Sequence, residues 1–151
     1  KGRTFAIIAL CLLCAGIFFL WSLLPKLFET KNIIQKIMRV SGYLSIFTII
    51  FLALGNHDII VRIAGIFAVI AFISCCLELY RAAYKTLFLL GVVCIFTFLS
   101  NYYIYETGMF IKALPVIQKI TFALYIAWFI GLDIALFRKV RQPFYIINEV
   151  S

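Results

Sequence analysis

Long apolar runs without charged residues dominate this sequence. Five such runs lie between charged residues, at positions 5–24, 40–57, 63–77, 86–105 and 120–132. A transmembrane helix requires roughly 20 apolar residues, with about 17 to 25 tolerated. The third and fifth runs reach this length when Arg62, Glu78 and Asp133 lie near helix ends. The runs therefore predict an integral membrane protein with five transmembrane helices.

The composition supports helices in a bilayer over a soluble fold. Apolar residues make up 66% of the 151 residues and the mean hydropathy is +1.12, whereas soluble domains contain roughly 45–50% apolar residues. Strands of a membrane barrel would alternate between lipid-facing and lumen-facing residues, but residues 5–24 are apolar in every register. We therefore expect an all-α, polytopic transmembrane helical bundle. No linker is visible in the sequence, so residues 1–151 are predicted to form a single domain.

The basic residues predict how the chain is oriented. The net charge is +8, and basic residues beside apolar spans reflect the positive-inside rule, so no nucleic-acid partner is expected. Nine basic residues fall on one side of the five predicted helices: Lys26, Lys31, Lys36, Arg39, Arg81, Lys85, Arg138, Lys139 and Arg141. Five fall on the other side: Lys1, Arg3, Arg62, Lys112 and Lys119. The sequence thus predicts a multi-pass protein with a cytoplasmic C-terminus and with its first residues on the opposite side. Because Lys1 is not a methionine and is placed outside, we also expect a cleaved leader or a further helix upstream.

The segment KLFETKNIIQKIMR, residues 26–39, mixes apolar and basic residues at helical spacing. It is interpreted as an amphipathic surface segment or as a cytoplasmic extension of the second helix. Its four cations are suited to anionic lipid head groups, although an ordinary positive-inside loop has the same composition. Membrane lipids are therefore expected partners.

The turn GNHD at residues 55–58 predicts a tight hairpin between the second and third helices, with Asp58 as a cap of the third. His57 and Asp58 are two adjacent residues with metal-binding side chains, whereas a zinc site requires three or four ligands. No metal or other cofactor is therefore predicted. Both residues remain candidates for an interface.

Aromatic residues gather where helices end. Tyr102 and Tyr103 close the fourth helix, and amphipathic rings prefer the membrane–water interface. Pro115 marks the start of the fifth helix, and Trp128 lies within it. We treat the two tyrosines and Trp128 as interface candidates. Four glycines, Gly42, Gly65, Gly91 and Gly131, lie within predicted spans. Most of them are expected to face neighbouring helices instead of lipid, because a missing side chain permits close approach.

Asp133 is the candidate for a ligand- or proton-linked role. An acid at the centre of a span costs about 2.5–3.5 kcal/mol on insertion scales, so it normally faces the bundle interior and has a partner. Arg81 is one available counter-charge, and Glu78 is the only candidate for a second acid in the spans. Both residues are further interface candidates. The alternative is an interfacial acid that pairs with Arg138 of its own helix. Arg138, Lys139 and Arg141 are expected to end this helix on the cytoplasmic side.

Motifs that name a reaction are missing from the sequence. It contains one histidine and no HExxH, GxSxG or Walker A motif, so no enzyme activity is predicted. Short hairpins and plain spans favour an accessory subunit of a membrane complex, or a bundle that interacts with lipid or a small hydrophobic ligand. Its expected protein partner is another membrane protein or a second copy of the chain. The alternative is a small transporter or channel.

Two stretches resemble a known family. The sequence NHDIIVRIAGIFAVIAF is similar to a short outer turn that leads into a glycine-containing helix, and LPVIQKITFALYIAWFIGL is similar to a last helix with a Gln-basic pair and a tryptophan. Both resemble the domain-of-unknown-function family 998 of small six-helix prokaryotic membrane proteins, whose layout is similar to the eukaryotic families related to the autophagy modulator DRAM. The resemblance implies a six-helix topology, with the first helix upstream of Lys1, and implies no activity.

Overall fold

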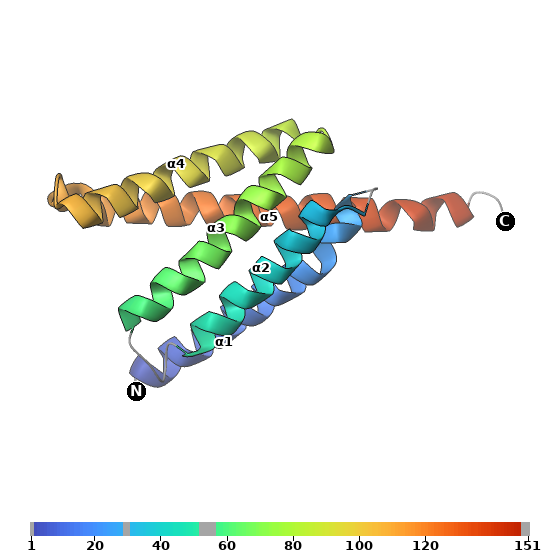
Figure 1. The fold of residues 1–151 in the computed structure, drawn as a ribbon. Helices are drawn as coiled ribbons and strands as arrows, with labels where there is room; N and C mark the ends of the chain where they lie inside the picture. The colour runs from blue at the N-terminus through green and yellow to red at the C-terminus, as the bar shows by residue number, and fades with distance from the viewer. Residues whose placement is uncertain (1, 29–30, 52–56, 149–151) are drawn as a thin grey trace. The chain divides into compact units, whose positions relative to one another are not determined.

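Helices make up 93% of the structure, a computed structural model that describes residues 2–28, 31–51 and 57–148, without the side chains of residues 2–4, 6, 7, 10, 57 and 142–148. The α-helices of these ranges are α1 (Gly2–Leu23), α2 (Ile33–Ile50), α3 (His57–Arg81), α4 (Lys85–Thr107) and α5 (Leu114–Asn148) (Figure 1). Two short 3₁₀ helices are η1 (Leu24–Leu27) and η3 (Ile111–Ala113). No strand occurs in the described ranges, so the predicted all-α fold is confirmed.

The chain divides into two compact units, Lys1–Glu78 and Leu79–Ser151. The first unit contains α1, η1, α2 and most of α3, and the second contains α4, η3 and α5. The prediction of a single domain therefore stays a prediction.

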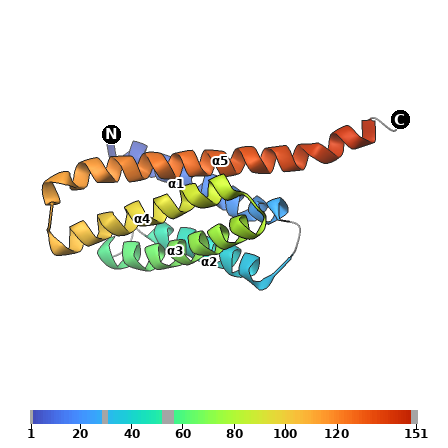
Figure 2. The same cartoon turned by 90° about the horizontal axis from the view of Figure 1, so that it is seen from above.

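In the first unit, α1 and α2 form an antiparallel hairpin, and α3 runs beside α2 (Figures 1 and 2). Trp21 is 5% exposed and covers Gly42, where an added Cβ would lie 2.8 Å from the indole ring. The Ser45 hydroxyl donates a hydrogen bond of 2.9 Å to the carbonyl oxygen of Ala64. Small residues in α2 therefore permit close approach of both neighbouring helices.

The segment after α1 contains the short helix η1 and the residue that caps α2. Pro25 lies in the first turn of η1, where its missing N–H costs little. Asn32 caps α2, because its side chain accepts a hydrogen bond from the backbone N–H of Gln35 at 3.0 Å. Helix α2 consequently begins at Ile33, seven residues before the predicted apolar run. Two interpretations of residues 26–39 were possible, a surface segment or an extension of the second helix. Residues 33–39 belong to α2, so the second interpretation holds for them.

Helix α3 begins at His57. Asp58 lies inside its first turn instead of at the capping position, and an acid there still complements the positive end of the helix dipole. Gly55 and Asn56 of the predicted turn lie outside the described residues.

In the second unit, α4 and α5 form an antiparallel hairpin (Figure 2). Gly108 ends α4 with a positive φ of 68°, and its N–H donates to the carbonyl oxygen of Ile104 at 3.0 Å. This left-handed conformation is accessible to glycine without steric cost. Phe110 also has a positive φ of 59°, immediately before η3.

Helix α5 is longer than predicted. We expected Arg138, Lys139 and Arg141 to end it, but it extends without interruption to Asn148, over 35 residues. This expectation was wrong, because cations near a helix C-terminus are favourable to the helix. Basic residues interrupt the apolar run, but the helix itself continues through residues 142–148.

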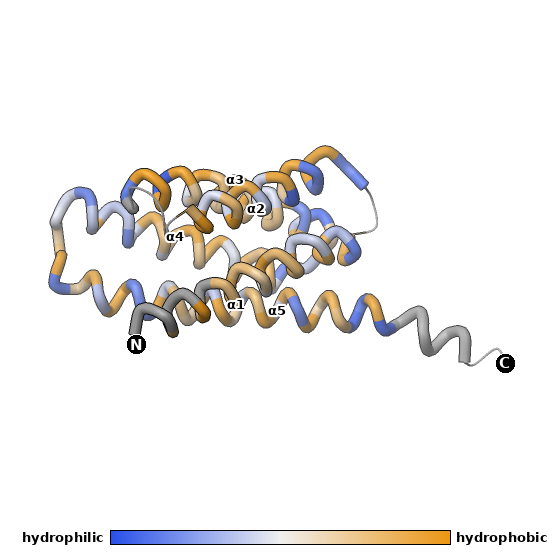
Figure 3. Tube along the Cα trace, turned by 90° about the horizontal axis from the view of Figure 1, so that it is seen from below, coloured by the Kyte–Doolittle hydropathy of each residue, from blue (hydrophilic) through white to orange (hydrophobic). Residues whose placement is uncertain are grey.

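Four helical segments of the described residues are long and apolar enough to cross a membrane: Ile33–Ile50, Asp58–Arg81, Lys85–Thr107 and Ile111–Arg141. A shorter apolar helical segment, Cys11–Leu27, comprises the second half of α1 and η1. Apolar residues line the middle of the helices in Figure 3, and hydrophilic residues gather at the turns. The chain is an integral membrane protein by these criteria, as predicted.

The expectation that most of these glycines face neighbouring helices agrees with the structure. An added Cβ would lie 2.7 Å from Leu87 Cδ2 at Gly131 and 2.8 Å from the Trp21 ring at Gly42. Gly91 is buried. Gly65 is the exception, because a Cβ there would meet nothing within 4 Å. A glycine in the sequence does not specify which side of its helix the neighbour occupies.

Candidate functional site

A buried acid at the end of α3 forms the most polar site in the first unit. Glu78 is 2% exposed, and its two carboxylate oxygens accept hydrogen bonds from the Asn32 side-chain amide at 2.9 and 3.0 Å. The Gln35 side-chain amide, 4% exposed, donates a third bond of 2.8 Å to Oε2. We call Asn32, Gln35 and Glu78 the amide–carboxylate cluster.

These contacts offset the cost of burying a carboxylate. Removing such a group from water costs several kcal/mol unless hydrogen bonds satisfy its oxygens. A hydrogen bond to a charged group contributes about 1.5–3 kcal/mol. Because Asn32 also caps α2, one side chain holds the start of α2 against the end of α3. The arrangement joins helices, and its amides activate no nucleophile.

The cluster also fixes which helix ends meet in the first unit. It brings the start of α2 to the end of α3, 46 residues later in the chain, and η1 joins α2 at this same end. Exposed cations surround it: Lys26, Lys31, Lys36 and Arg39. This end of the first unit is therefore strongly basic, as the predicted topology requires. Which side of the membrane it faces stays a prediction.

Asp133 has an exposed side chain, and no hydrogen bond or ion pair joins it to Arg138 or to any other described residue. Its depth follows from the α4–α5 hairpin, in which Trp128 contacts Leu87. At about 1.5 Å per residue, Asp133 lies about 7.5 Å past Trp128, whereas Lys85, the first residue of α4, lies only about 3 Å past Leu87. Asp133 is thus level with the first residue of α4, Lys85, or lies beyond it along the axis of the hairpin. Its ligand- or proton-linked role stays a prediction.

Trp128 lies inside the second unit. It is fully buried, and its indole Nε1 donates a hydrogen bond of 2.9 Å to the Leu87 carbonyl oxygen. Gly131 lies about one helical turn from Trp128. Its missing side chain lets the backbones of α4 and α5 approach each other at this level. The side chain therefore holds α4 against α5.

The tyrosine candidates lie at the opposite end of that hairpin. Tyr102 and Tyr103 are 51% and 56% exposed. The Tyr103 hydroxyl contacts the Met109 sulfur at 3.7 Å. Exposed rings at a helix end are typical of the membrane–water interface.

The remaining interface candidates lie at the two ends of α3. Arg81 is exposed in its last turn, where a cation complements the helix dipole. Asp58 is exposed in the first turn. His57 begins the helix, and its side chain lies outside the described residues. Glu78 is thus the one acid among these candidates that the structure buries.

Sequence reasoning missed both amides of the cluster. The signal was present, because Asn32 followed three residues later by Gln35 is the pattern of a helix capping box. It also missed a polar contact in the α4–α5 hairpin, where Asn101 Nδ2 donates to Thr121 Oγ1 at 2.6 Å and to the Thr97 carbonyl at 3.0 Å. Asn101 Oδ1 is buried without a hydrogen-bond partner among the described residues.

The fold and these contacts define a class, the polytopic helical membrane proteins. Comparison with known proteins adds no family, because no protein-family model, curated protein or solved structure matches the chain. The described residues hold no group of three or more His, Cys, Asp or Glu residues that could bind a metal ion.

Proposed function

We propose that this protein is a non-catalytic integral membrane protein that acts by contact within the bilayer, as an accessory subunit of a membrane assembly. The observation that carries the proposal is the contrast between its inner and outer surfaces. Several polar side chains between helices bond to another side chain or to a backbone carbonyl, whereas the exposed side chains of the spans are mostly large and apolar.

The inner contacts are used for assembly of the helices. The amide–carboxylate cluster joins α2 to α3, Ser45 joins the same helices, and Asn101 and Trp128 join α4 to α5. Hydroxyls such as those of Thr48 and Ser100 bond to carbonyls of their own helices. These polar groups therefore have structural uses that are sufficient to explain their presence.

The outer surface is large for so small a chain. Only 17–33% of the residues in the four spans are buried. Phe47, Phe96 and Phe122 are among the exposed large side chains, at 60, 71 and 65%. Apolar faces of this kind contact lipid or the helices of another membrane protein. A protein partner or a second copy of the chain would cover part of them.

The proposal is tested by isolating the protein from its own membrane in a mild detergent. We expect native mass spectrometry to find a complex of fixed stoichiometry, with another membrane protein or with further copies of the chain. The same preparation, reconstituted in vesicles, should carry no ion or solute flux.

Flux in vesicles by a monomer that forms no complex would refute the proposal and favour the small transporter or channel. In that case the Asp133→Asn variant separates two roles for the acid. Loss of flux with retained folding would assign the carboxylate to transport, and wild-type flux would remove it from the site.

The resemblance to family 998 is retained as a proposal about topology. Its support is the pair of stretches described above, at residues 56–72 and 114–132. Determining the number and sidedness of the helices in the full-length protein tests it, because the family layout requires six helices, with the first upstream of Lys1.

A further inference from the structure

One surface of the α1–α2 hairpin combines cations, hydroxyls and aromatic rings. The Arg39 guanidinium carbon lies 6.0 Å from the centre of the Tyr43 ring. The Tyr43 hydroxyl is 3.0 Å from the Ser22 hydroxyl, and the Phe18 ring centre is 5.1 Å from that of Tyr43. Lys36 precedes Arg39 by one helical turn on the same side of α2. We call these five residues the basic α1–α2 face.

The positive charge of this face has no described counter-charge. None of the four cations Lys26, Lys31, Lys36 and Arg39 forms an ion pair with a residue that the structure describes. Glu29 lies outside the described residues. The Glu78 carboxylate at this end of the unit is buried and accepts hydrogen bonds from two amides. The described part of this face therefore offers its positive charge to an external anion.

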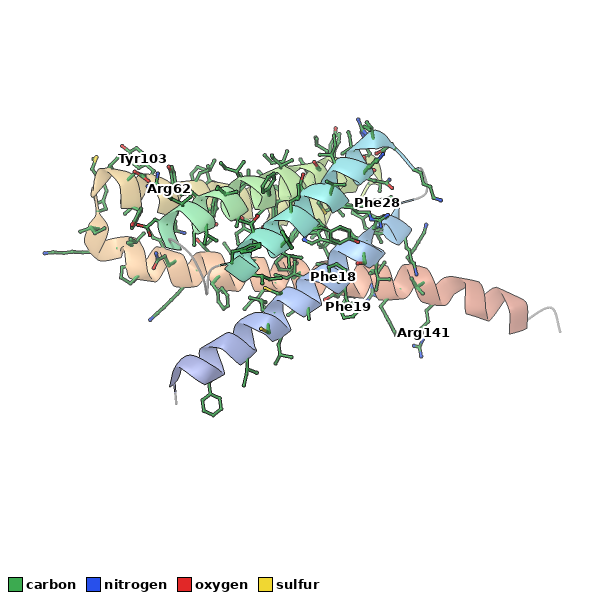
Figure 4. All side chains as sticks on the ribbon, turned by 60° about the horizontal axis from the view of Figure 1, so that its bottom comes forward. Phe18, Phe19, Phe28, Arg62, Tyr103 and Arg141 are labelled. Carbon is green, nitrogen blue, oxygen red and sulfur yellow. The ribbon has the colours of Figure 1, made fainter. Side chains whose placement is uncertain are left out.

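The apolar part of the surface indicates what kind of anion fits. Phe18 and Phe19 are exposed on α1 (Figure 4), and Leu44 and Phe47 are exposed on α2 beyond Tyr43, toward the middle of the span. Cations at the end of a span, followed by exposed apolar side chains, match an amphiphile with an anionic head and hydrocarbon tails. A soluble phosphate would use only the cations.

We propose that the basic α1–α2 face binds one anionic phospholipid. Arg39 and Lys36 contact the phosphate oxygens, the hydroxyls of Tyr43 and Ser22 lie within the head-group region, and the acyl chains lie along Phe18 and Phe47. Arginine suits this role because its planar fork donates two parallel hydrogen bonds to a phosphate. Basic pockets between transmembrane helices bind anionic head groups in the same way.

The inference deepens the proposed function, since it rests on a protein that acts by contact within the bilayer. Its test uses only the purified full chain and defined lipid, so the two proposals fail separately. Absence of a membrane partner would leave lipid binding unaffected. Absence of lipid binding would leave a partner complex intact.

The experiment is a titration of the chain in a neutral detergent with palmitoyl-oleoyl phosphatidylglycerol or the matching phosphatidylcholine, followed by native mass spectrometry. We expect at least tenfold tighter binding of phosphatidylglycerol. A single Lys36→Gln or Arg39→Gln substitution should weaken it about fivefold, and the double variant about 25-fold, because each cation near the surface contributes a similar increment. Phosphatidylcholine binding should not change.

The matched control is the double variant Arg138→Gln, Arg141→Gln, which removes the same charge from exposed positions on α5. It should bind phosphatidylglycerol within about twofold of the wild type, because the proposed contacts are local. Circular dichroism checks that each variant is folded. If the double variant of Lys36 and Arg39 does not fold, the two single variants, both at exposed positions, provide the test.

Three results would overturn the proposal. Equal loss in the α5 control would show a general effect of net charge, and equal binding of the two lipids would show no anion site. Competition by millimolar glycerol 3-phosphate as effective as competition by phosphatidylglycerol would assign the face to a soluble phosphate instead of a lipid.

Discussion

The substitution Gln35→Leu tests whether the amide–carboxylate cluster stabilises the fold. It removes the 2.8 Å hydrogen bond to Glu78 Oε2 while it leaves the cap of α2, which is made by Asn32, in place. Leucine has a similar size, so the cavity contribution is small. The buried carboxylate loses one of its three described hydrogen bonds.

The expected loss follows from two opposing effects. A hydrogen bond to a charged group contributes about 1.5–3 kcal/mol. Leucine loses less side-chain entropy on burial than glutamine, by about 0.5–1 kcal/mol. We therefore expect the free energy of unfolding to fall by about 1–2 kcal/mol. Intramembrane hydrogen bonds measured elsewhere lie at or below this range, with a maximum of about 1.7 kcal/mol.

The assay is reversible unfolding in mixed micelles, titrated with dodecyl sulfate and followed by circular dichroism. The control is Gln118→Leu, the same substitution at an exposed position of α5, which should change the free energy of unfolding by less than about 0.5 kcal/mol. A double-mutant cycle of Gln35→Leu with Glu78→Leu should give a coupling energy of at least about 0.5 kcal/mol. Unchanged or increased stability of Gln35→Leu, with no coupling, would refute the structural role of the cluster.

The remaining predictions concern packing and topology. Gly42→Ala should destabilise the chain by about 1–3 kcal/mol, since its Cβ would meet the Trp21 ring and overpack the α1–α2 contact, whereas Gly65→Ala should not lower the unfolding midpoint in the same assay. Trp128→Phe should cost about 1 kcal/mol or more, because it removes the indole donor to the Leu87 carbonyl and leaves a smaller ring; a midpoint equal to that of the wild type would argue against this contact. Single cysteines at Lys36 and His57, in a background without the five native thiols, should be labelled from opposite sides of sealed vesicles, and labelling of both from one side would defeat the positive-inside assignment.

The class of protein and the approximate positions of its helices follow from local features of the sequence. An apolar run long enough to cross a bilayer must form a helix there, because no water satisfies its backbone groups. This local rule placed the start of the fourth helix at Thr86, one residue from the observed Lys85. Pro115 likewise marked the start of α5, which begins at Leu114.

Local rules failed for basic residues, because such residues can end an apolar span without ending the helix. The basic residues after Asp133 were interpreted as the end of α5, yet the helix continues to Asn148. A cation interrupts an apolar span but not a hydrogen-bonded helix. Hydropathy therefore predicts where the apolar span ends, and the end of the helix required the structure.

Only the tertiary structure decided which polar residues meet. Glu78 contacts Asn32 and Gln35 across 46 and 43 residues of sequence, and no periodicity relates positions so far apart. The same holds for the glycines, since Gly42 and Gly65 are alike in the sequence but only Gly42 faces a neighbouring helix. The sequence specifies each helix through interactions within a few residues. The faces that come together depend on how side chains of several helices pack at once.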